Sequence, residues 1–91
     1  MPELIYEHRV QMRDADGEVY LPRVYGQARR DGTWMGWIEF HPPEGEGMVL
    51  RTDRETSQPN REALVYWASG LEPIYFDGAF SRASELATHS G

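Results

Sequence analysis

The chain of 91 residues contains no cysteine and no lysine. Without cysteine it can form neither disulfides nor thiolate metal sites, and it has no catalytic thiol. Without lysine it can form no Schiff base and has no lysine to place in a phosphate-binding loop. All nine basic residues are therefore arginines, whose planar guanidinium groups bind carboxylates and phosphates in a bidentate way. This composition, with its single asparagine, is typical of a GC-rich bacterial genome.

Long hydrophobic segments are also missing. The longest apolar run covers residues 63–68, whereas a membrane-spanning helix needs roughly 18 residues. Residues 1–12 include acids and a histidine and lack the apolar stretch of a secretory signal. We therefore expect a cytoplasmic protein with no membrane contact.

Motifs for metal, cofactor or nucleophile chemistry are absent from the sequence. His8, His41 and His89 are too widely spaced to form a pair of metal ligands. None of the serines lies in a Gly-x-Ser-x-Gly nucleophile motif. The Gly-x-Gly at residues 45–47 has acids beside it and no third glycine, which does not suit a phosphate-binding loop. We expect no metal, no cofactor and no catalytic residues, and the sequence favours a non-enzymatic protein.

What the chain does contain is a regular series of β-prone segments separated by turn signals. Asp31-Gly32 lies between two such segments and favours a two-residue type I′ hairpin, in which both residues have positive φ. Residues 14–17 suit a four-residue hairpin loop, and the Pro- and Gly-rich residues 42–47 suit a longer connection. These signals predict four antiparallel strands in meander order, at residues 4–13, 18–30, 33–41 and 48–56. Pro22 within the second strand indicates a locally unpaired side or a bulge.

The C-terminal third has helical periodicity. Leu64, Trp67, Ala68 and Leu71 recur at the spacing of an amphipathic helix, which we place at residues 59–70. A short strand at 74–76 and a helical turn at about 78–88 should follow. The prediction is a single α+β domain over residues 1–91, in which a four-stranded antiparallel meander carries one helix on one face and a short C-terminal strand and helical turn complete the fold.

The outward face of this sheet is the first candidate site. If Arg13 lies opposite Glu18 and Arg30 opposite Thr33, alternation separates an apolar face from a mostly polar one. The polar face then contains guanidinium groups among large side chains, a mixture typical of protein interfaces and of single-strand nucleic-acid platforms. Its members are Arg9, Arg13, Tyr20, Met35 and Trp37. Alternatively, Trp37 covers a gap at Gly26 on the neighbouring strand and has no binding role.

The junction between the fourth strand and the helix is the second candidate. A helix N-terminus with nearby arginines could bind an anion through Arg54, Thr56, Ser57 and Arg61. The structural alternative is that Thr56 and Ser57 cap the first helical turn. Asp53 and Glu55 share a strand face, so paired-carboxylate chemistry is conceivable there.

Three functions remain open from the sequence. The first is a small non-enzymatic protein-interaction or regulatory module that uses the outward face and can self-associate. The second is a nucleic-acid-binding module, in which arginines contact phosphates and Tyr20 or Trp37 stacks on bases; the net charge of −6 disfavours it. The third is an enzyme of unrecognised type centred on the strand–helix junction. The predicted strands contain seven arginines and five acids, so a local basic patch can exist on an acidic chain.

Overall fold

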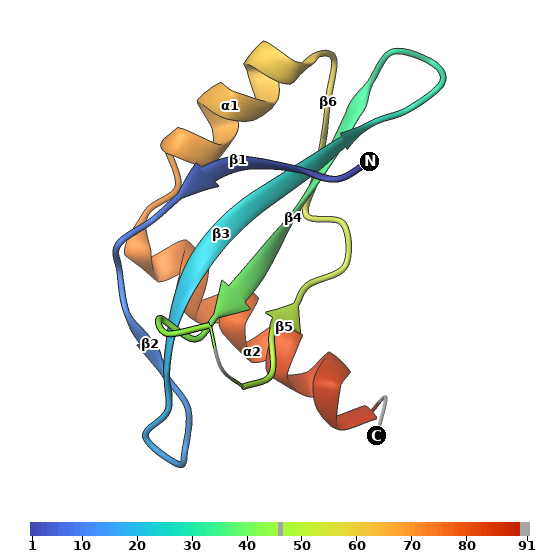
Figure 1. Ribbon diagram of the computed structural model, residues 1–91. Helices are drawn as coiled ribbons and strands as arrows, with labels where there is room; N and C mark the ends of the chain where they lie inside the picture. The colour runs from blue at the N-terminus through green and yellow to red at the C-terminus, as the bar shows by residue number, and fades with distance from the viewer. Residues whose placement is uncertain (46, 90–91) are drawn as a thin grey trace.

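The computed structural model describes residues 1–45 and 47–89 and shows an α+β fold with a six-stranded antiparallel sheet and two helices (Figure 1). The strands are β1 (Glu3–Glu7), β2 (Met12–Arg13), β3 (Val19–Ala28), β4 (Trp34–His41), β5 (Leu50–Arg51) and β6 (Thr56–Gln58). The helices are α1 (Arg61–Ser69) and α2 (Pro73–His89). β1 and β2 both pair with β3, and β5 and β6 both pair with β4. The predicted meander is confirmed, with its first and fourth strands each divided into two pieces.

The division of the first strand occurs beside Pro22. The Pro22 carbonyl accepts a hydrogen bond from the His8 backbone N–H at 3.0 Å, but proline has no N–H to donate in return. β1 ends at Glu7 and β2 begins at Met12, so the ladder is interrupted there. The unpaired side predicted from Pro22 is therefore confirmed.

A bulge divides the predicted fourth strand into β5 and β6. The backbone N–H groups of Thr52 and Glu55 bond to the carbonyls of Ile38 and Gly36. Between these two contacts the chain has two residues, Asp53 and Arg54, where β4 has one, Trp37. The Thr52 carbonyl does not meet the Ile38 N–H; the Thr52 Oγ1 accepts that hydrogen bond instead, at 3.0 Å. Both residues are buried, so the hydroxyl satisfies a backbone donor that water cannot reach.

Thr52→Val is expected to lower the free energy of unfolding by about 1–3 kcal/mol, because it leaves the buried Ile38 N–H without an acceptor. Thr52→Ser keeps the hydroxyl and should cost only about 0.8 kcal/mol for the lost methyl group. Urea unfolding measures both variants. A valine variant as stable as the serine variant would show that the hydroxyl does not hold the bulge.

Both hairpin loops differ from the prediction in the same way. Arg29 donates its N–H to the Thr33 carbonyl, so the β3–β4 loop has three residues, and only Gly32 has positive φ, at 89°. This is the geometry of a type I turn followed by a left-handed glycine, not the predicted type I′ turn. Arg13 likewise pairs with Val19 and not with Glu18. Each loop shifts the pairing by one residue, and a one-residue shift moves every side chain of β3 to the opposite face.

Two glycines on the sheet form the site against which α1 packs. Gly26 of β3 and Gly36 of β4 lie directly opposite each other, and a Cβ at either position would come within 3 Å of a Leu64 methyl group. Leu64 is fully buried in the notch that the two glycines leave. Asn60 caps α1, because its Oδ1 accepts a hydrogen bond from the Ala63 N–H at 2.8 Å. The predicted helix over 59–70 is thus confirmed as α1 over 61–69.

The predicted strand at 74–76 is wrong, because these residues belong to α2, which runs without interruption from Pro73 to His89. Proline is common in the first turn of a helix and also just after a helix ends, so Pro73 fits both positions. Phe76, Ala79 and Ala83 follow at helical spacing and are buried. Phe80 packs its ring 5.5 Å from Tyr20 and 5.1 Å from Phe40. The predicted helical turn is therefore the second half of a 17-residue helix.

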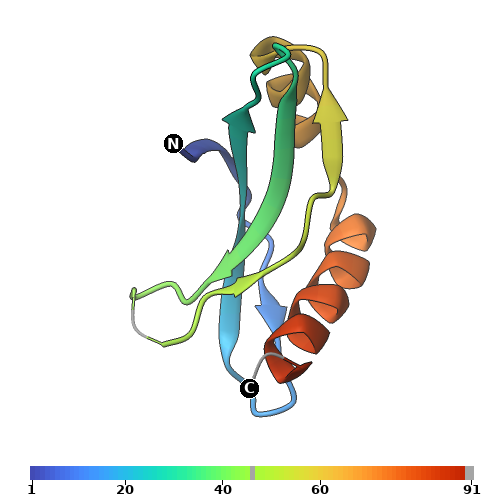
Figure 2. The same cartoon turned by 90° about the vertical axis from the view of Figure 1, so that its right-hand side faces the viewer.

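The two faces of the sheet have different environments. We call the face that contacts α1 and α2 the inner face; its buried members on the central strands include Tyr20, Val24, Ile38 and Phe40. Neither α1 nor α2 covers the opposite face, which we call the outer face, and Figure 2 shows α2 on one side of the sheet and the loop after β4 on the other. The outer face is turned toward the reader in Figure 1.

Candidate functional site

The candidate site is the centre of the outer face. The register places Arg23 opposite Glu39 and Tyr25 opposite Trp37, and it places Glu39 opposite Arg51 on the other side. Because cross-strand partners share a face, these side chains and that of His41 form one group on the outer face. We call this group the outer-face cluster; it consists of Arg23, Tyr25, Trp37, Glu39, His41 and Arg51.

Glu39 accepts two hydrogen bonds from other members of the cluster. Its Oε2 accepts a hydrogen bond from the Trp37 indole Nε1 at 2.9 Å, and its Oε1 accepts one from His41 Nε2 at 2.9 Å. Arg23 Nη1 lies 3.5 Å from His41 Nδ1. An imidazole that accepts at Nδ1 and donates at Nε2 fits both contacts as the neutral tautomer. Both carboxylate oxygens of Glu39 are therefore used within β4.

Aromatic rings and a guanidinium complete the cluster. The Tyr25 ring stacks 6.3 Å from Trp37 and 6.0 Å from His41, measured between centroids. The Arg51 Cζ lies 4.4 Å from the Trp37 centroid, over the face of the ring. Trp37 is only 1% exposed, although it lies on the face without helices. Arg51 itself is exposed, and no hydrogen bond or ion pair holds its guanidinium within residues 1–45 and 47–89.

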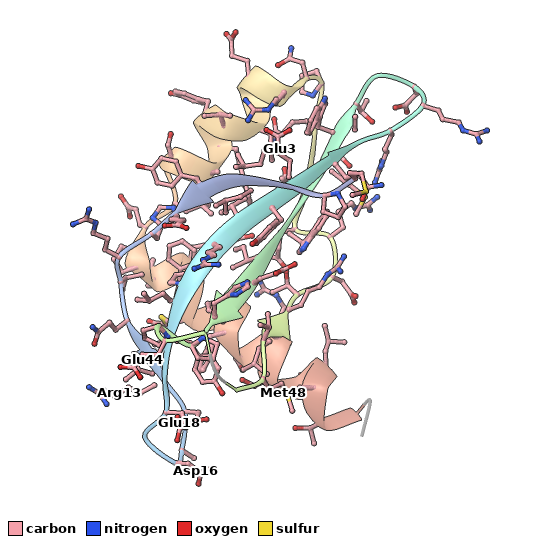
Figure 3. The ribbon with its side chains drawn as sticks, viewed as in Figure 1. Glu3, Arg13, Asp16, Glu18, Glu44 and Met48 are labelled. Carbon is pink, nitrogen blue, oxygen red and sulfur yellow. The ribbon has the colours of Figure 1, made fainter. Side chains whose placement is uncertain are left out.

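The structure divides the predicted interaction face. Arg13, Met35 and Trp37 do lie on the outer face, and Figure 3 shows Arg13 near the β2–β3 hairpin. Tyr20 lies on the inner face and is only 8% exposed, because the one-residue shift in pairing turns it toward Phe80. Arg9 is exposed in the segment between β1 and β2. The prediction for Tyr20 is thus wrong, and the expected position of Trp37 opposite Gly26 is wrong as well.

Most of the outer-face cluster could not be found without the correct register. The predicted register, with Arg30 opposite Thr33, places Tyr25 on the apolar face and gives Arg23 no role in the interaction face. The only sequence signal was the alternation of Trp37, Glu39 and His41 on one strand, next to the turn residues 42–43. That alternation indicates a shared face but not which neighbours on β3 and β5 reach it.

The four residues of the predicted anion site do not converge. Thr56 and Ser57 belong to β6, and the cap of α1 is Asn60. Arg61 binds the carboxylate of Glu3, which lies beside α1 in Figure 3. Arg54 is exposed in the bulge. The predicted capping role of Thr56 and Ser57 is therefore wrong, and the arginine beside the helix start already has a carboxylate partner.

The nearby carboxylate of Glu55 has a structural role. Its Oε1 accepts hydrogen bonds from the Tyr75 hydroxyl, at 2.5 Å, and from the Arg82 guanidinium. These contacts link the bulge to α2 across the inner side of the sheet. Burial, followed by the hydrogen bond and the charge of Glu55, raises the pKa of Tyr75 from 10.0 to about 12.

We expect Tyr75 to ionise near pH 12 and to make stability pH-dependent in alkali. A raised pKa means that folding favours the protonated phenol, so its contribution is intact below about pH 10 and is lost as the pH rises to about 12. Spectroscopic titration of tyrosinate in the wild type and in Tyr75→Phe isolates this group. A Tyr75 that titrates near pH 10 would contradict the burial of its phenol and its hydrogen bond to Glu55.

No group of three or more His, Cys, Asp or Glu side chains that could hold a metal ion occurs among the described residues. His8 is a packing residue, since its Nε2 lies 2.8 Å from the Ala68 carbonyl and its ring contacts Phe76. Within the same residues, no helix is long and apolar enough to cross a membrane.

Comparison with known proteins adds no further information on function. No family model, no curated protein and no solved structure matches this chain. The geometry of the outer face is therefore the basis for assigning a role.

Proposed function

We propose that this protein is a non-enzymatic interaction module and that a partner protein docks on the outer face. The observation that carries the proposal is that α1 and α2 both leave this face uncovered while its central side chains are already held in one network. Side chains that are ordered before binding reduce the entropic cost of association. A second copy of the chain is the simplest partner.

The composition of the face agrees with protein recognition. Tyrosine, tryptophan, methionine and arginine are the residue types enriched at interfaces. The outer face presents Tyr25, Met35 and Arg51 on the same side of the sheet as the buried Trp37. Leu4, which pairs with Tyr25, is 41% exposed and extends the apolar part of the face onto β1. Protein binding is therefore a better fit to this surface than a reaction.

The positions of the aromatic rings favour protein over nucleic acid as the partner. Single-strand platforms stack bases on exposed rings. Trp37 is covered by Arg51, and Tyr20 packs on the inner face, so neither ring named for stacking is accessible. The net charge of −6 also opposes the counterion release on which nucleic-acid affinity depends.

The test uses two matched pairs of variants. Leu4→Asp places an acid on the outer face, and Ile74→Asp places one on α2, where the side chain is 78% exposed. Arg51→Glu reverses a charge in the outer-face cluster, and Arg30→Glu reverses one in the β3–β4 loop. Sedimentation velocity over a range of concentrations measures self-association, and quantitative affinity capture from the source organism identifies other partners.

We expect Leu4→Asp and Arg51→Glu to weaken the association at least about tenfold, while Ile74→Asp and Arg30→Glu leave it unchanged. Circular dichroism establishes that each variant is folded. Association that depends on Ile74 and not on Leu4 would contradict the proposal. So would a monomer that captures no protein in an outer-face-dependent way.

A further inference from the structure

A cavity of about 680 Å³ lies at the β5 edge of the sheet. Its walls come from two layers, because Met35 belongs to the outer face and Ala83 and Leu86 belong to α2 on the inner side. The segment from Met48 to Arg54 forms the rim between them. The cavity therefore passes around the edge of the sheet and is continuous with the outer face.

The bulge explains why this edge is open. With Asp53 and Arg54 inserted between Thr52 and Glu55, the chain leaves β4 and cannot offer a straight strand to a neighbour. Bulges and charged residues at an edge hinder the addition of another strand. An occupant must therefore use the cavity through its side chains and not through a backbone ladder.

Several of the apolar side chains that line the cavity are exposed. Met48 is 64% exposed, and Val49 and Leu86 are also among the large hydrophobic side chains that reach solvent. Figure 3 labels Met48 on the loop that leads into β5. Large apolar side chains gathered around one opening are the usual sign of a binding site for an apolar group.

The charged residues at the rim indicate the second chemical group that a ligand of the cavity should carry. Among the described residues that line the cavity, Arg51 and Arg54 are basic and Asp53 is acidic. The carboxylate that faces Arg51 across the strand, Glu39, is already bonded to Trp37 and His41. Stacking on Trp37 holds the Arg51 guanidinium in place, and Arg51 as a whole is exposed. A carboxylate is the complementary group for a guanidinium presented in this way.

We propose that the edge cavity binds an acidic peptide segment of a partner protein, with an apolar side chain in the cavity and a neighbouring carboxylate on Arg51. This inference rests on the proposed function, since Arg51 belongs to the outer-face cluster. It specifies the chemistry of the partner segment, in which leucine-like and acidic residues lie close together in the sequence.

The test uses the full chain and four probes. The first is an N-acetylated, C-amidated peptide of alternating leucine and glutamate. The second has glutamine in place of glutamate, and the third has serine in place of leucine. The fourth probe is dodecanoate, which combines a carboxylate with an apolar chain that is not a peptide. Methyl NMR of Met48, Val49 and Leu86 follows binding of each probe.

We expect the leucine–glutamate peptide to shift these methyl resonances, and the glutamine and serine peptides to bind about tenfold more weakly or less. Arg51→Gln should remove the preference for glutamate over glutamine, while Arg30→Gln should keep it. Equal affinity for the glutamate and glutamine peptides, or shifts confined to methyl groups away from the cavity, would overturn the inference. Binding of dodecanoate without binding of the first peptide would overturn it as well.

A further pair of measurements separates the two proposals. If Leu4→Asp weakens the capture of a partner and Val49→Asp does not, the inference about the cavity fails and the proposed function stands. If the leucine–glutamate peptide binds with the stated preferences but no partner depends on Leu4, the proposed use of the outer face fails and the cavity remains a peptide site.

Discussion

Replacing Leu64 with alanine is expected to lower the free energy of unfolding by about 2–5 kcal/mol. Leu64 is fully buried, and its two methyl groups fill the notch above Gly26 and Gly36. Alanine would leave a cavity that the neighbouring strands cannot close, because both glycines lack a side chain. A domain of this size has a total stability of only about 5–15 kcal/mol, so the loss should be large enough to populate the unfolded chain.

Chemical unfolding measures this effect, and α1 supplies its own control. Tyr66 is 83% exposed on the same helix, so Tyr66→Ala should change stability by no more than about 0.5 kcal/mol. Equal losses for Leu64→Ala and Tyr66→Ala would mean that α1 does not insert Leu64 between the strands. The orientation of the helix on the sheet would then have to be different.

Replacing Trp37 with alanine is expected to cost about 3–5 kcal/mol, although the residue lies on the face without helices. The indole is 1% exposed, and it donates a hydrogen bond to Glu39 and supports the Arg51 guanidinium. The substitution removes the largest buried side chain of the outer-face cluster. It also leaves Glu39 Oε2 without its donor.

Trp37→Phe separates packing from hydrogen bonding. Phenylalanine keeps a ring beneath Arg51 but loses the indole N–H, so the expected cost is about 1–3 kcal/mol. Thermal and urea unfolding measure both variants. A loss below about 0.5 kcal/mol for Trp37→Ala would indicate an exposed ring and a cluster that does not hold it.

The hydrophobic pattern was sufficient to predict the order of the strands and the faces of β4. Ile38 and Phe40 alternate with Trp37 and Glu39, and this period of two identifies a strand with one covered face. Leu64 and Ala68 similarly identified the helix that packs on it.

The face of β3 could not be predicted, because it depends on the backbone conformation of the hairpin loops. Asp31-Gly32 suits both a two-residue loop with two positive φ values and a three-residue loop with only Gly32 positive. The second loop forms, which moves Tyr20 inside and Tyr25 outside. Since the outer-face cluster depends on this register, the sequence pattern could place Trp37 but not the neighbours that cover it.

The start of α2 was missed for a different reason. Ile74, Tyr75 and Phe76 form a short apolar run, which by itself fits a strand as well as a helix. The hydrogen bond between Tyr75 and Glu55 and the packing of Phe76 are contacts between distant parts of the chain. Such contacts decide between the two structures only once the sheet has formed.

The central claim is that the protein meets its partner through the outer face and not through its helices. Hydroxyl-radical footprinting of the free and associated protein tests this claim directly, because exposed or half-buried side chains on both sides serve as reporters. We predict that oxidation of Leu4, Tyr25 and Met35 falls on association, while that of Tyr66 and Ile74 is unchanged. Protection of Tyr66 and Ile74 with continued oxidation of Leu4, Tyr25 and Met35 would contradict it.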